Sequence, residues 1–95
     1  MTLETLTIDG LRPRLNERFR LQASNVSLDL TLIEVEDLGD SLTRRAFSLL
    51  FAAPAQPVVP QAIYRLENDV TGPLEMFLVP LGPERGVFRY QAVFT

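Results

Sequence analysis

The sequence contains no cysteine, histidine, lysine or tryptophan among its 95 residues. Without cysteine it can form no disulfide, thiolate nucleophile or thiolate metal site, and the redox compartment is left undetermined. Without histidine and lysine, a serine hydroxyl lacks the bases that normally activate it for nucleophilic catalysis. We therefore expect a protein that is not an enzyme and that carries no metal or cofactor.

The chain also lacks a strong excess of charge of one sign and any long apolar run. The net charge is −3, the nine basic residues are all arginine, and no basic run is present, so we expect no nucleic-acid partner. No apolar stretch approaches the roughly 20 residues needed to span a bilayer. The start of the chain, MTLE, lacks the pattern of a secretory signal. These features predict a cytoplasmic protein with no membrane association.

The composition that remains is typical of one folded domain. Hydrophobic residues make up 46% of the chain and charged residues 22%, which is far from the composition of disordered chains. A chain of this length is too short for two independent cores. We expect a single domain over residues 1–95.

Alternation of apolar and polar residues predicts strands along most of the chain. Asp9 can cap a short helix that contains Pro13, and the prolines near residue 57 predict an extended surface connection. The expected fold is all-β with one short N-terminal helix and about six antiparallel strands in a meander, forming a small sandwich or partly open barrel. The expected helix covers 9–15, the strands cover 18–23, 26–36, 47–51, 63–67, 74–79 and 87–94, and the main connections are a turn at 24–25, a polar loop at 37–43 and the segment 53–60.

Apolar residues on the second face of several strands are the main functional hint. Period-two counting slips between Leu32 and Ile33, which predicts either a bulge there or burial of both faces. Either the N-terminal segment covers the second face, or an apolar patch remains for a partner. The candidate interface consists of Leu50, Phe77 and Val79, with Phe77 as the anchor. The whole second-face set is Ile33, Val35, Leu50, Ile63, Phe77 and Val79.

Two clusters of charge are candidate sites. One is acidic and could bind Ca²⁺ or act as acid and base, but it lacks calcium-loop spacing, so a solvated acidic loop is the preferred interpretation. The other is basic and could hold phosphate or a partner's carboxylates, but cross-strand pairing with Asp29 or Glu34 explains it better. Arg44 and Arg45 are expected in a loop. The acidic cluster is Glu34, Glu36, Asp37 and Asp40, and the basic cluster is Arg12, Arg14, Arg18 and Arg20.

Several segments together resemble a known family. They are LETLT (3–7), FSLLF (47–51), PQ (60–61), YRLE (64–67), FLVPLGP (77–83) and YQAVF (90–94). The chain resembles an uncharacterised bacterial family of small β proteins, classed as a domain of unknown function, whose members are often encoded beside phage-tail-collar-like proteins. The resemblance implies an accessory role in a phage-tail-like assembly and supplies no catalytic residue.

Two functional hypotheses follow. The first is a non-enzymatic interaction or assembly module that docks onto a protein partner or onto itself through an apolar sheet face or a free strand edge. The alternative is a small β-barrel that binds an apolar small molecule in its interior. A contiguous exposed patch would favour the first hypothesis, and an enclosed apolar cavity would favour the second.

Overall fold

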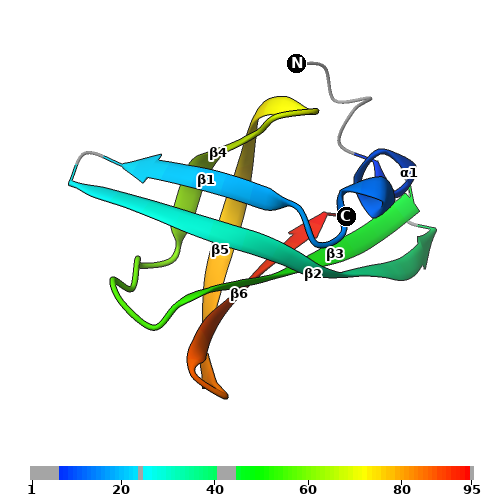
Figure 1. Ribbon diagram of the computed structural model, residues 1–95. Coiled ribbons are helices and arrows are strands. Elements are labelled where there is room, and N and C mark those ends of the chain that lie inside the picture. Colours follow the sequence, from blue (N-terminus) through cyan, green and yellow to red (C-terminus); the bar gives the residue numbers. More distant parts are fainter. Residues whose placement is uncertain (1–6, 24, 41–44, 95) are drawn as a thin grey trace.

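The structure, a computed structural model, describes residues 7–23, 25–40 and 45–94 and confirms the expected all-β class (Figure 1). One short helix precedes six antiparallel strands. The elements are α1 (Ile8–Leu11), the 3₁₀ turn η2 (Arg12–Arg14), β1 (Arg18–Ala23), β2 (Val26–Asp40), β3 (Arg45–Pro54), β4 (Ala62–Asn68), β5 (Gly72–Glu84) and β6 (Val87–Phe94).

The helix begins at Ile8, one residue earlier than the sequence predicts. Thr7 is the N-cap, because its Oγ1 accepts a hydrogen bond from the backbone N–H of Gly10 at 3.1 Å. Asp9, the expected cap, lies instead in the first turn, where a negative charge is favourable. Pro13 ends the α-helix in the 3₁₀ turn.

The six strands close into a ring in the order β1-β2-β3-β6-β5-β4. Each half of the chain is a three-stranded meander, but the whole chain is not a simple one. The connection after β3 leads to the far side of the ring, so that β4 pairs with β1 and β6 pairs with β3. The prolines of this connection cannot donate ladder hydrogen bonds, so it leaves the sheet instead of turning back beside β3.

The predicted bulge in β2 is present. The register with β3 shifts between Leu32 and Glu34. Ile33 occupies the extra position and is exposed, while Val35 returns to the inner face and packs against the core. Val35 was therefore wrongly assigned to the second face, because a bulge exchanges the two faces beyond it.

β2 is also longer than expected. It continues through a second register shift, between Asp37 and Gly39, to Asp40, so 37–40 is strand and not loop. Gly39 has φ of 91°, which favours glycine. The rest of the predicted polar connection, residues 41–44 with Arg44, lies outside the described residues, as does Ser24 of the predicted turn at 24–25.

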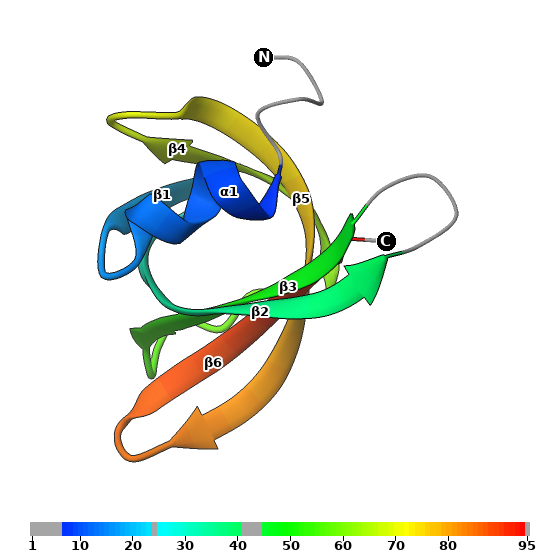
Figure 2. The ribbon, with the colours of Figure 1, turned by 90° about the vertical axis from the view of Figure 1, so that its right-hand side faces the viewer.

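Side chains from all six strands fill the barrel, and its two ends are closed differently. At one end α1 inserts Ile8 and Leu11 into the core, and Figure 2 looks toward this end with α1 in front of the strands. At the other end Val59 is buried, and its N–H donates to the hydroxyl of Tyr90 at 3.1 Å. The segment 53–60 was predicted as surface chain, but Ala53 and Pro54 belong to β3 and Val59 belongs to the core.

Candidate functional site

The three candidate interface residues lie close together on the outer face of the barrel. Phe77 and Val79 are two residues apart on β5, so they share a face. Val79 is opposite Gln91 of β6, and Gln91 is opposite Leu50 of β3. Leu50 and Val79 thus flank one glutamine on three adjacent strands.

Phe77 is joined by a fourth apolar residue. It is the cross-strand partner of Ile63 on β4. Phe77 is 47% exposed and Ile63 is 69% exposed, while Leu50 and Val79 are half-buried. We call Leu50, Ile63, Phe77 and Val79 the outer apolar strip; it extends over β3, β5 and β4, with Gln91 of β6 between Leu50 and Val79.

One exposed residue beside the strip was not selected from the sequence. Val93 is 49% exposed and lies opposite Ser48, two residues from Leu50 along β3. The signal was available, because the last strand alternates and its inward residues include Tyr90 and Ala92. Val93 had to point outward for that reason.

The described part of the N-terminal segment does not cover the outer apolar strip. Ile8 and Leu11 belong to the core cluster inside the barrel. The helix contacts β2 and β3 at the end of the ring. Of the two alternatives left open by the sequence, the described residues support an apolar patch that faces solvent.

Two residues of the acidic cluster, Asp37 and Asp40, pair with Arg45, which the sequence predicts in a loop. Arg45 is the first residue of β3, and both its Nε, at 2.9 Å, and its Nη2 donate to Oδ2 of Asp37. This hydrogen bond, followed by one from the backbone N–H of Gly39, lowers the pKa of Asp37. Arg45 also lies 3.6 Å from Asp40.

The other two acidic residues face outward on β2. Glu34 is opposite Leu50 and Glu36 is opposite Ser48, whose hydroxyl donates to Oε1 of Glu36 at 3.5 Å. Among the residues that the structure describes, no three carboxylates are grouped so as to hold a metal ion. Glu34 and Glu36 instead form an acidic border beside the strip.

The arginines near the start of the chain pair partly as expected. Arg18 lies 3.7 Å from Asp29 on β2, and Arg14 lies 3.1 Å from Glu17. The register places Glu34 opposite Leu50 of β3 and not opposite these arginines. Arg20 is opposite Asp29 on one side and Glu67 on the other, so carboxylates flank it across both neighbouring strands. Exposed pairs of this kind contribute little to stability.

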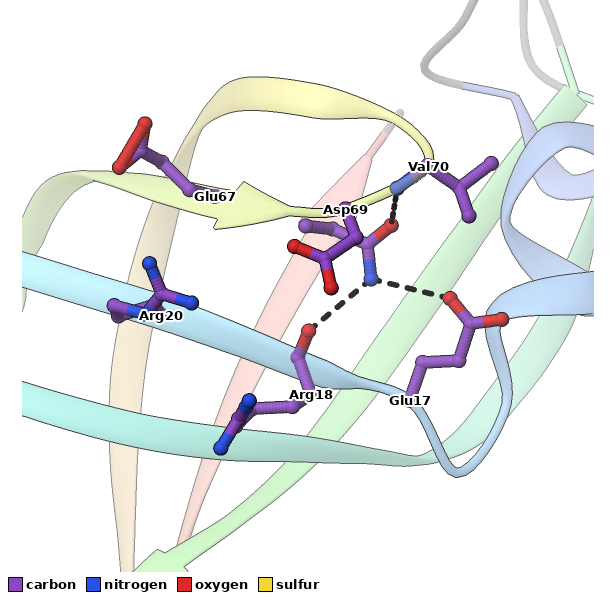
Figure 3. A pocket seen from close by; sticks show the side chains of 7 residues that line it. Glu17, Arg18, Arg20, Glu67, Asp69 and Val70 are labelled. Atoms are coloured by element: carbon purple, nitrogen blue, oxygen red, sulfur yellow. Dashed lines mark hydrogen bonds between the residues drawn. The ribbon is translucent and has the colours of Figure 1, made fainter.

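Arg18, Arg20 and the buried Asn68 line a surface pocket of about 310 Å³ (Figure 3). Its lining also includes three carboxylates, so it offers charges of both signs. The carboxylates are Glu17, Glu67 and Asp69.

Both polar atoms of the Asn68 side-chain amide form hydrogen bonds within the protein. Its Nδ2 donates to Oε1 of Glu17 at 3.2 Å and to the carbonyl oxygen of Arg18 at 3.1 Å. Its Oδ1 accepts from the backbone N–H groups of Val70 and Thr71 at 2.9 and 3.1 Å. Asn68 therefore ties the β4–β5 turn to the start of β1, which is a structural role.

A second hollow, of about 370 Å³, lies at the tip of the β1–β2 hairpin. Its lining combines polar and apolar residues, and it is open to solvent: Gln22, Ala23, Asn25, Val26 and Ser27. Neither hollow offers the enclosed apolar walls that small apolar ligands need.

The family model described as "Domain of unknown function (DUF6916)" matches residues 6–94. The chain belongs to this family. No curated protein and no solved structure matches the chain. Over the described residues, no helix has the length and apolar character to cross a membrane.

Proposed function

We propose that this protein is a non-enzymatic interaction module that docks onto a protein partner through the outer apolar strip. The observation that carries the proposal is the exposure of Phe77 and Ile63, two large apolar residues paired across neighbouring strands. Scattered exposed apolar residues are normal, but contiguous ones usually mark an interface.

The strip has the organisation of a small interface. Phe77 supplies an aromatic anchor, the type of residue that carries a large share of binding energy. Glu34 and Glu36 border it on β2, and Arg65 opposite Glu75 borders it on β4 and β5. An apolar centre with a charged rim is the usual arrangement in protein interfaces.

The setting that we propose is an accessory role in a phage-tail-like assembly. This part rests on the family resemblance described under Sequence analysis, and the strip supports it only in so far as an assembly protein needs a docking face. The alternative, an apolar ligand inside the barrel, draws no support from the described hollows, because both are open surface features and side chains of all six strands fill the interior.

The experiment compares Phe77→Ala with Val70→Ala in capture from the native host. Val70 is also an exposed apolar residue, but it lies in the β4–β5 turn and outside the strip. Proteins captured by the unmodified chain and by Val70→Ala, but lost with Phe77→Ala, are then purified and tested for direct binding. Both variants should keep the melting temperature of the unmodified chain.

We expect at least one partner whose purified form binds in a manner dependent on Phe77, with an affinity loss of about thirtyfold, equivalent to about 2 kcal/mol. If every captured protein binds Phe77→Ala as well as it binds the unmodified chain, docking through the strip is wrong. If Phe77→Ala strongly lowers the melting temperature without changing capture, Phe77 contributes to folding stability and not to docking. That result would favour the ligand hypothesis.

A further inference from the structure

The ring of strands is weakest between β1 and β4. Along its other edge β4 pairs with β5 over its full seven residues. With β1 it shares only two residue pairs, Arg20 with Glu67 and Leu21 with Leu66. Figure 1 shows the reason: β4 crosses β1 at an angle, and its first half leads away from β1.

Residues 62–65 of β4 consequently have a ladder partner on one side only, within the part of the chain that the structure describes. Backbone groups along such an edge can pair with another strand. Proteins usually protect exposed edges with charges or prolines. Here Gln61, Ala62, Ile63 and Tyr64 are all uncharged, and the first charge is that of Arg65.

We propose that a second copy of this chain pairs with this edge, β4 against β4 in antiparallel orientation, about a two-fold axis at Ile63. This inference goes beyond the proposed function, because it concerns self-association through a backbone edge and not partner capture through Phe77. A two-fold interface brings the same patch of both copies together, so the patch must be complementary to itself.

The residues of β4 satisfy that condition in this register. Ile63 lies opposite the second copy's Ile63, Ala62 lies opposite Tyr64, and Gln61 lies opposite Arg65, so no like charges meet. Because directly opposed residues in an antiparallel pair share a face, both isoleucines stay on the outer face. Phe77 is the neighbour of Ile63 within each copy, so one apolar row of four side chains would cross the dimer.

A second copy fits this edge better than a charged partner does. The only charge along residues 62–65 is that of Arg65 at the end of the edge, which gives little basis for selecting a partner of opposite sign, and the strongly exposed apolar residue Ile63, at 69%, lies at the centre of the proposed axis. A register shifted by one residue onto Tyr64 would place Arg65 against the apolar side chain of Ile63. The register centred on Ile63 is therefore the one that the sequence of β4 favours.

The absence of cysteine makes a direct test possible. Opposed residues in an antiparallel pair have Cα atoms about 4.5–5.5 Å apart, which lies within the range that a disulfide spans. Ile63→Cys should therefore cross-link into a covalent dimer under mild oxidation. Arg65→Cys is the matched control, on the same strand and face, because the two substituted positions would lie about 13 Å or more apart across the axis.

We expect Ile63→Cys to cross-link at least about tenfold faster than Arg65→Cys, since only its sulfurs can meet. Sedimentation of the unmodified chain should show a concentration-dependent dimer, and Ile63→Arg, which opposes two like charges at the axis, should be a folded monomer with an unchanged melting temperature. A monomer at every concentration, or equal cross-linking of the two cysteine variants, overturns the proposal. Either result leaves partner capture through Phe77 standing, and loss of that capture leaves the dimer standing.

Discussion

Substitution of Asn68 tests how the barrel is closed. Asn68 ends β4, is only 6% exposed, and makes four hydrogen bonds to groups on both sides of the β1–β4 seam. Because β1 and β4 share only two residue pairs, this side chain supplies a large part of the polar contacts that hold the seam together. Asn68→Ala removes all four at once.

The expected cost follows from those four bonds. A neutral hydrogen bond contributes about 0.5–1.5 kcal/mol net, and a buried group left without a partner costs about 1–3 kcal/mol. The N–H groups of Val70 and Thr71 belong to a surface turn and can bind water, whereas the carbonyl of Arg18 lies partly buried beneath the side chain. We therefore expect the free energy of unfolding to fall by about 2–4 kcal/mol, a large fraction of what a small domain has.

Urea denaturation followed by circular dichroism measures this loss. With a slope of about 1.5 kcal/mol per molar urea, the midpoint should fall by about 1.3–2.7 M. The control is Asp69→Ala, an exposed residue in the same turn, which should change the midpoint very little. If Asn68→Ala and Asp69→Ala have the same midpoint, the seam does not depend on Asn68 and the reasoning is refuted.

Further predictions concern the core, the acidic residues and the last strand. Tyr90→Phe removes the hydroxyl that accepts the buried N–H of Val59, so the free energy of unfolding should fall by about 1–3 kcal/mol in urea titrations; an unchanged value would contradict this role. The hydrogen bond from Arg45 lowers the pKa of Asp37 below its ordinary value of 3.8, so its stabilising effect is present above that value and disappears as pH falls through the lower folded pKa. Asp37→Asn should accordingly lose less stability in acid than the unmodified chain, and parallel stability curves from pH 6 to about 2 would argue against it. Truncation before Tyr90 removes most of β6, which pairs with both β3 and β5, and should abolish the cooperative thermal transition; its survival would show β6 to be dispensable. Melting curves with EDTA and with Ca²⁺ should coincide, and stabilisation by Ca²⁺ would show that the carboxylates of β2 form a site after all.

The sequence was sufficient for the features that depend on neighbouring residues. Alternation located all six strands, and the slip at Leu32 and Ile33 located the bulge of β2. The same counting placed Phe77 outside while Met76 and Leu78 are buried. These predictions held because the pleat of a strand directs successive side chains to opposite faces, whatever the strand pairs with.

Features that depend on distant residues needed the tertiary structure. Val35 lies inside because a bulge two residues earlier exchanged the faces, and Val59 lies inside because its segment closes one end of a ring. Arg45 reaches Asp37 because β2 and β3 continue as paired strands beyond the residues whose apolar alternation predicts them. None of these residues carries a local signal of its partner.

The candidate site divides in the same way. Sequence alone selected Leu50, Phe77 and Val79 as second-face residues, but their contiguity required the pairing of β3 with β6 and of β6 with β5. The free first half of β4 follows from the angle at which β4 crosses β1. Periodicity indicates which face of its strand a residue occupies. The order of strands in a closed ring is decided by the packing of the whole core. Only that order determines which outer residues become neighbours and which strand edges stay open.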